Sequence, residues 1–308
     1  MSKEIRIDPY AAKDIREAVQ RLLRDLGNPE PPLNLDHVRK LQNLDLTYYS
    51  KTDINILDEI AHKFMLGKGI IASKARNMLE VINKVGLKAL IVPDQRRIFI
   101  DNEVVDKKKR FVQAHEISHD LIEWHRTLLL GDNDESLSLM CHQEIEAEAN
   151  YGARHLLFMG ERFQTESRDY DLKWENLQKL SGIYGNSITT TIWQTVHTSD
   201  QAFPMFGAIG CHPYYPEIGS RDNGSNIAHF IRSDSFCDRF PNIAPHTIFS
   251  AMRSYMKRNK RGPLGEGICI FNDVNGDPYE FRVSSFCNTY DVLTFGRMVR
   301  AQPKIIFF

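Results

Sequence analysis

The stretch RFVQAHEISHDL, residues 110–121, places two histidines four residues apart, with a glutamate directly after the first. No glycine or proline occurs between residues 102 and 130, and the apolar residues around the histidines favour a helix. Residues four apart lie on one helical face, so the imidazoles of His115 and His119 can converge on one zinc ion. Glu116 stands where its carboxylate can hold an attacking water and accept its proton. The stretch therefore predicts a zinc site on a helix.

His125 is one candidate for the third zinc ligand. It has the spacing of the third histidine in metalloproteases with the longer pattern H-E-x-x-H-x-x-G-x-x-H. That arrangement needs a sharp turn at the glycine, and Ile122 occupies this position here. On a continuous helix His125 would lie about 240° around the axis from His119. We therefore interpret His125 as a residue near the end of the helix.

Glu146 is the other candidate, at the start of a second predicted helix. It shares a helical face with Asn150, four residues later. A glutamate ligand fits a site of two histidines and one glutamate, and Asn150 can support a ligand histidine from behind. Glu144 and Glu148 are interpreted as a solvated acidic first turn of the same helix.

These two stretches resemble the ImmA/IrrE-type zinc metallopeptidases. The family pattern is H-E-x-x-H, a short connection, and then E-x-x-A-N-x-F-A-x-x-L-L-M-P. The second motif is matched in EIEAEANYGARHLLFM, residues 144–159, by Glu146, Ala149, Asn150, Ala153, Leu156 and Leu157. Gly152 replaces the aromatic residue of the family, and residues 158–160 depart from Met-Pro. The resemblance extends more weakly over about residues 10–197 and implies one Zn²⁺ bound by His115, His119 and Glu146.

The resemblance implies a zinc-dependent endopeptidase with Glu116 as the catalytic base. Its relatives cleave helix-turn-helix transcriptional repressors, often in stress or mobile-element responses, so a DNA-binding repressor is the expected substrate. Tyr151, His125 and His155 are candidates for stabilising the oxyanion. The alternative is a non-catalytic zinc-binding module that docks a transcription factor or nucleic acid. The presence of Glu116 argues against this alternative, because a structural zinc site needs no general base.

The composition is that of a soluble globular protein, with 308 residues, 42% hydrophobic and 26% charged. The net charge of −1 favours neither tight nucleic-acid binding nor binding to an anionic membrane. No apolar run approaches the roughly 20 residues of a membrane span, and the N-terminus does not look like a signal peptide, so we expect a cytoplasmic protein. The five scattered cysteines indicate reduced thiols. The oligomeric state stays open.

The expected fold class is α+β, with a boundary after residue 198 where glycine, proline and aromatic residues become frequent. The first domain, residues 1–198, is expected to be a mainly helical, zincin-like metallopeptidase with a small sheet. Its predicted helices cover residues 10–26, 35–41, 53–65, 73–86, 172–184 and 184–196, the last two completing the domain. Its predicted strands cover residues 44–49, 87–92 and 97–101. Arg97–Asp101 is interpreted either as the strand that pairs with an extended substrate or as a purely structural strand.

The second domain, residues 199–308, is expected to be a smaller α+β domain without metal ligands. Asn275 and Gly276 predict the turn of a strong β-hairpin, and residues 247–257 predict a helix. Some relatives in the family carry a sensor-like domain resembling the GAF fold. The resemblance therefore implies that this domain regulates the peptidase or presents its substrate.

Overall fold

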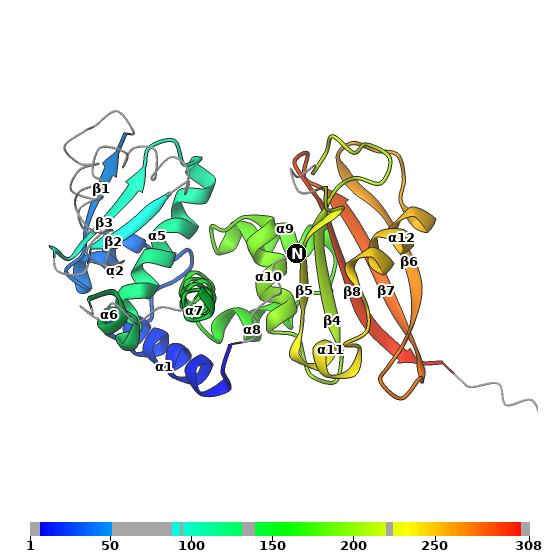
Figure 1. Ribbon diagram of the computed structural model, residues 1–308, viewed down its shortest axis with the longest axis horizontal. Coiled ribbons are helices and arrows are strands. Elements are labelled where there is room, and N and C mark those ends of the chain that lie inside the picture. The colour runs from blue at the N-terminus through cyan, green and yellow to red at the C-terminus, as the bar shows by residue number, and fades with distance from the viewer. Residues whose placement is uncertain (1–6, 51–87, 93–94, 131–138, 220–223, 303–308) are drawn as a thin grey trace, which may run out of the picture. The chain divides into compact units, whose positions relative to one another are not determined.

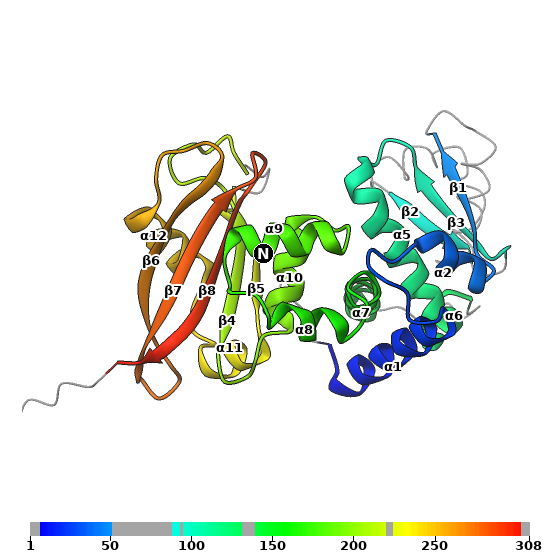
Figure 2. The same cartoon turned by 180° about the vertical axis from the view of Figure 1, so that it is seen from behind.

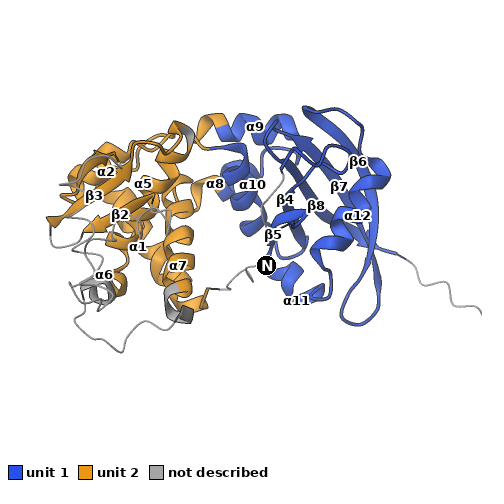
Figure 3. Cartoon of the chain, turned by 45° about the horizontal axis from the view of Figure 1, so that its top comes forward, with its two compact units in different colours: residues 1–4, 164–181, 187–308 blue, residues 5–163, 182–186 orange. Residues whose placement is uncertain are grey.

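The computed structural model describes residues 7–50, 88–92, 95–130, 139–219 and 224–302. It has the expected mixed α+β character, with helices and two separate sheets (Figure 1). The chain divides into two compact units, which Figure 3 colours separately. One unit comprises Ile5–Phe163 and Gly182–Asn186, and the other comprises Met1–Glu4, Gln164–Ser181 and Ser187–Phe308. The helices predicted at 53–65 and 73–86 lie outside the described residues.

The sheet of the first unit has three strands in the order β1-β3-β2. They are β1 (Asp45–Tyr49), β2 (Ala89–Val92) and β3 (Arg97–Asp101), close to the predicted positions. The central strand β3 pairs in parallel with β1 and antiparallel with β2. Our interpretation of β3 as the strand that pairs with substrate is therefore wrong, because neighbours on both sides already use its backbone groups. Among the described strands, β2 lies at an edge of this sheet.

Helices cover this sheet in a second and a third layer (Figures 1 and 2). Helix α5 (Asp106–Leu121), which contains both histidines of the motif, packs against β2 and β3. Helix α7 (Leu139–Leu157) packs against α5, and α1 (Pro9–Asp25) packs against α7. The short helix α2 (Leu35–Leu41) also contacts α5, and it has the predicted bounds. The ligand helix α5 thus lies between the sheet and the two helices α7 and α2.

Small residues bring α7 close to α5. Ala149 and Ala153 are fully buried in α7. A Cβ atom added at Gly152 would lie 3.1 Å from both Cβ and Oγ of Ser118, tighter than ordinary packing. The glycine that replaces the family's aromatic residue therefore suits a contact in which the two helix backbones approach closely. This contact also holds Glu146, one turn before Asn150, beside the histidine face of α5.

Helix α5 ends earlier than the absence of glycine and proline would predict. Its last residue is Leu121, and Ile122 takes an extended conformation with φ −85° and ψ 105°. A new helix, α6 (Glu123–Leu130), begins at the next residue. Every residue type can adopt this conformation, so the chain turns at Ile122 without the glycine that a left-handed turn would need. His125 consequently projects from a different helix than His115 and His119.

The second unit contains a five-stranded antiparallel sheet in the order β5-β4-β8-β7-β6. Its strands are β4 (Met205–Gly210), β5 (Ile227–Arg232), β6 (Gly262–Asn272), β7 (Pro278–Cys287) and β8 (Val292–Ala301). The predicted hairpin is the β6–β7 pair, and Gly276 in its turn has a φ of +77° that other residues rarely adopt. The last strand in sequence order, β8, occupies the centre of the sheet.

Helices cover both faces of this sheet. Helices α11 (Asp234–Arg239) and α12 (Pro245–Tyr255) bury an aromatic core that includes Phe206, Phe236 and Phe281. On the opposite face of the sheet, α9 (Trp174–Ile183) and α10 (Ile188–His197) pack their apolar residues against the strands. The members of this second cluster include Trp174, Leu177, Ile192, Val196, Ile209, Ile231, Phe286, Leu293 and Phe295.

The division between the units differs from the boundary expected after residue 198. Helices α9 and α10 were expected to complete the peptidase domain, but their buried residues belong to the core of the C-terminal sheet. The chain passes back into the first unit between these helices, at Gly182–Asn186. There the fully buried Tyr184 packs its ring against Phe158 and Phe163. Helix α8 (Arg162–Ser167) spans the point where the chain leaves the first unit.

Candidate metal centre

Three side chains from α5 and α7 bring their ligand atoms together as the sequence predicts. Nε2 of His115 lies 3.2 Å from Nε2 of His119 and 3.3 Å from Oε2 of Glu146. Nε2 of His119 lies 3.6 Å from Oε1 of Glu146. A tetrahedral zinc ion with bonds of about 2.0–2.1 Å separates its ligand atoms by about 3.3 Å. The three measured separations are thus close to those that zinc requires.

The group is open to solvent on the glutamate side. The side chain of Glu146 is 44% exposed, whereas those of His115 and His119 are 15% and 6% exposed. Among the described residues, these three form the only group of this kind that can hold a metal ion. Three protein ligands with an open side are typical of catalytic zinc sites, whereas structural sites are closed by a fourth protein ligand.

The charges of the three residues suit cation binding. Burial by itself would raise the pKa of Glu146, but hydrogen bonds with His115 and His119 outweigh it and hold the pKa well below its ordinary value. Burial lowers the pKa of His119 to about 4, so this ring is neutral at pH 7. Burial also opposes charge on His115, but its hydrogen bond with Glu146 and the charge of Glu116 raise its pKa.

Glu116 is buried beside this group without being a member of it. The residue is 7% exposed, and burial raises its pKa to about 7. The charge of His115 and a hydrogen bond from the backbone of Ile91 act in the opposite direction. Ile91 belongs to β2, so the edge strand of the sheet reaches the carboxylate predicted to be the base. A carboxylate with a pKa near neutrality can both accept and return a proton.

Asn150 supports His115 as its position on α7 suggests. The side chain of Asn150 is among the hydrogen-bonding groups that raise the pKa of His115. It lies one turn after Glu146 on α7. Glu146 and Asn150 thus both act on the same histidine, although Nδ1 of His115 is buried without a hydrogen-bond partner among the residues that the structure describes.

His125 lies behind His119 instead of beside the metal position. Its Nδ1 atom is 3.1 Å from Nδ1 of His119, on the opposite side of that ring from Nε2. The His125 side chain is fully buried, and its Nε2 atom is 2.8 Å from Oε2 of Glu148. The candidate third histidine is therefore a neighbour of a ligand and no member of the group that can hold the ion.

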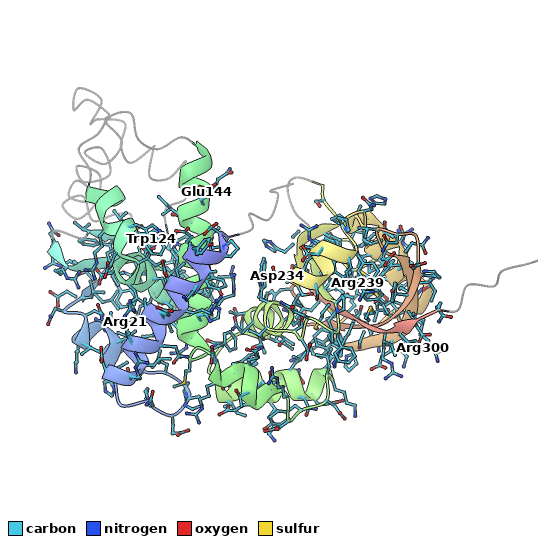
Figure 4. All side chains as sticks on the ribbon, turned by 90° about the horizontal axis from the view of Figure 1, so that it is seen from below. Arg21, Trp124, Glu144, Asp234, Arg239 and Arg300 are labelled. Carbon is cyan, nitrogen blue, oxygen red and sulfur yellow. The ribbon has the colours of Figure 1, made fainter. Side chains whose placement is uncertain are left out.

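Glu148 is not the solvated first-turn residue that the sequence suggested. Its side chain is only 13% exposed, and its Oε2 atom also accepts a hydrogen bond of 2.7 Å from the indole N–H of Trp124. Figure 4 labels Trp124 on α6 and Glu144 on α7, the two helices that meet in this contact. Glu144 is exposed, as expected.

Asp120 anchors the end of α5 to the hairpin of β2 and β3. Its buried carboxylate forms ion pairs with Arg96, which precedes β3, and with Arg126 in α6. Arg96 also donates to the backbone carbonyl of Gln42. A single buried carboxylate therefore links the ligand helix, the sheet and the helix that carries His125.

The three candidates for stabilising the oxyanion, Tyr151, His125 and His155, are engaged in other contacts. The Tyr151 hydroxyl accepts a 2.8 Å hydrogen bond from Arg16 in α1, and its ring lies against His155. Both ring nitrogens of His125 already have partners, His119 and Glu148. We therefore assign none of the three to the oxyanion.

Sequence patterns did not identify the contacts of Glu148 and Trp124 behind His119. They also did not identify Asp120 and its arginine partners. The only local signal was the adjacent Trp124-His125 pair after the motif, which becomes informative once the chain is known to turn at Ile122. In the part of the chain that the structure describes, no helix is long and apolar enough to cross a membrane.

Comparison with known proteins identifies no family. No protein-family model matches the chain, and no curated protein is significantly similar to it. Among solved structures, a Mycobacterium tuberculosis transcriptional regulator aligns over 92% of this chain and 87% of its own, with a TM-score of 0.49 and 13% sequence identity. Similarity at this level does not indicate an activity.

Proposed function

We propose that this chain is a zinc-dependent endopeptidase of the ImmA/IrrE type. The observation that carries the proposal is the spacing of the His115, His119 and Glu146 donor atoms, 3.2–3.6 Å apart, beside the buried carboxylate of Glu116. The partly exposed side chain of Glu146 supports access of water to the ion. The resemblance to the family supplies the reaction class, and the geometry supplies the residues.

His115, His119 and Glu146 would hold the ion. Zinc, when bound, supplies a Lewis acid that polarises a carbonyl and lowers the pKa of water. Glu116 would accept a proton from the attacking water and donate it to the amine that leaves the cleaved peptide bond. Asn150 would keep His115 in the orientation that directs its Nε2 atom at the ion.

The substrate that we propose is a helix-turn-helix repressor or a similar regulatory protein in the cytoplasm. This part of the proposal rests on the family resemblance alone. For the C-terminal unit, a five-stranded sheet with helices on both faces, we propose a regulatory or substrate-presenting role as a GAF-like sensor, again on the family resemblance alone. We do not propose tight binding of this chain to nucleic acid.

The experiment that tests the activity is incubation with the repressor encoded nearest to this chain, followed by mass analysis of fragments. We expect defined fragments with the zinc-loaded protein and none after chelation or with Glu116→Gln. The same substitution separates the enzyme from a non-catalytic zinc module. If Glu116→Gln keeps the biological activity and no fragments form with the unaltered protein, the protein acts as a binding module and the proposal fails.

A further inference from the structure

The contacts behind His119 form one continuous chain of hydrogen-bonding groups. It runs from His119 Nδ1 to His125 Nδ1 over 3.1 Å, and from His125 Nε2 to Glu148 Oε2 over 2.8 Å. The indole N–H of Trp124 closes it by donating to the same Glu148 oxygen over 2.7 Å. His119 and His125 are 5% and 0% exposed, so water does not compete for these contacts.

Only one placement of the protons satisfies all three contacts and leaves His119 able to bind a metal. An indole N–H can only donate, so Glu148 accepts from Trp124 and, as a carboxylate, also accepts from Nε2–H of His125. The Nδ1 atom of a neutral His125 then carries a lone pair and accepts from Nδ1–H of His119. A neutral His119 protonated on Nδ1 has its lone pair on Nε2, the atom that faces His115 and Glu146.

We propose that His125, Glu148 and Trp124 are positioning residues that fix the tautomer and the ring orientation of the ligand His119. A metal-bound histidine usually donates its second N–H to a carboxylate or a carbonyl group directly. Here a second histidine stands between the ligand and the carboxylate, and α6 supplies it because the chain turns at Ile122. This proposal rests on the proposed metal site and is independent of whether the protein is a peptidase.

The residues of this hydrogen-bonded chain behind His119 come from different helices. Glu148 belongs to α7, two residues after Glu146, so α7 contributes one carboxylate to the metal position and another behind His119. His125 and Trp124 belong to α6, whose start is linked to α5 through Arg126 and Asp120. The orientation of His119 thus depends on how α5, α6 and α7 pack together.

The test is a measurement of zinc affinity by competition with a chromophoric chelator, on the full chain. We expect His125→Phe to lower the affinity about 10- to 100-fold, since loss of a residue that supports a ligand typically has this effect. Glu148→Gln keeps side-chain size, and Trp124→Phe keeps an aromatic ring but removes the N–H donor; both should lower the affinity less. Glu144→Gln, an exposed change on α7, is the matched control and should leave the affinity unaltered. Thermal unfolding of each metal-free variant shows whether it is folded.

A purely structural role for His125 is distinguished by two further readouts. In the zinc-loaded protein, ¹⁵N-resolved NMR should show a slowly exchanging proton on Nδ1 of His119, and His125→Phe should abolish that signal. The double variant His125→Phe/Glu148→Gln should bind zinc no more weakly than His125→Phe, because both changes interrupt one chain. Unaltered zinc affinity and an unaltered His119 signal in a folded His125→Phe variant would overturn the inference. Failure of the unaltered protein to bind zinc would instead remove the proposed function, and zinc binding without cleavage would remove only the peptidase activity.

Discussion

Nε2 of His115 lies 3.3 Å from Oε2 of Glu146, although His115 belongs to α5 and Glu146 to α7. The metal group therefore depends on a contact between two helices as well as on the spacing within one. Because a charged ligand contributes at least as much as a supporting residue, Glu146→Gln should lower zinc affinity on the order of 100-fold. Isothermal titration with zinc measures this, with Glu144→Gln as the control. An unchanged affinity would show that Glu146 is not a ligand.

Replacement of Glu116 should separate metal binding from catalysis. Glu116→Gln keeps the shape of the side chain and leaves His115, His119 and Glu146 in place, so zinc should bind with a stoichiometry of about one. The variant lacks the base, and loss of general-base catalysis typically slows a reaction about 10²- to 10⁴-fold. Cleavage rates with the repressor substrate test this. A variant as fast as the unaltered protein would place the base elsewhere.

The raised pKa of Glu116 also predicts how the metal-free protein responds to pH. The pKa is about 7 in the folded state against 4.5 as the ordinary value, so between these values the folded state binds more protons than the unfolded state. The free energy of unfolding therefore falls as pH rises through this window. At about 1.4 kcal/mol per pH unit, the penalty above pH 7 is roughly 3 kcal/mol. Glu116→Gln should remove it.

Urea unfolding of the metal-free proteins provides the comparison. Glu116→Gln should be more stable than the unaltered protein at pH 8, and the two should converge near pH 4.5. The pKa of His119 is lowered to about 4, so this residue gives the opposite slope between pH 4 and its ordinary value of 6.5. That slope is common to both proteins, and the difference between them reports Glu116 together with its charge interaction with His115. Equal stability at pH 8 would mean that the carboxylate is not desolvated.

Asp120 should be important for stability because it is a buried charge with two partners. Asp120→Ala removes the ion pairs with Arg96 and Arg126, both of which are partly exposed and can regain water. We expect a loss of about 2–3 kcal/mol, at or below the lower end for breaking a buried pair. Asp106→Ala is the matched control on the same helix, since its pair with Lys109 lies at the surface and should contribute little to stability. Denaturant unfolding in chelator compares them.

Truncation after residue 198 should not yield a soluble peptidase. The fragment keeps α9 and α10 but loses the sheet that buries Trp174, Ile192 and Val196. We expect it to aggregate or to bind a hydrophobic dye strongly in size-exclusion and fluorescence assays, with the full chain as reference. A monomeric fragment that binds zinc and no dye would show that the two helices do not need the C-terminal sheet.

The sequence predicted the parts of the site that depend on local spacing. His115 and His119 follow from a helical repeat, and Glu146 and Asn150 follow from a second motif on one helix. The contact from His125 to Glu148 could not be predicted, because it requires the turn at Ile122, where no glycine or proline marks the end of α5. The pair of Asp120 and Arg96 joins elements by packing alone, and no spacing rule relates them.

The same limit applies to the division of the fold. The apolar faces of α9 and α10 are visible in the sequence, but the pattern does not say which sheet they cover. Proximity in sequence to the histidine motif favoured the first unit, whereas the residues that cover these helices belong to β4, β5, β7 and β8. The strands of the first unit were predicted near their observed positions, yet their order in the sheet, and hence the central place of β3, depends on pairing between distant segments.

The central position of β8 has a consequence for synthesis of the chain on the ribosome. Until residues 292–301 have emerged, β4–β5 and β6–β7 exist only as two separate two-stranded ribbons, and such ribbons are marginally stable in water. Helices α9 and α10 are made about a hundred residues earlier, and the part of their apolar cluster that Leu293 and Phe295 of β8 cover stays open until then. The C-terminal unit can therefore close only when its last described strand inserts between the two ribbons.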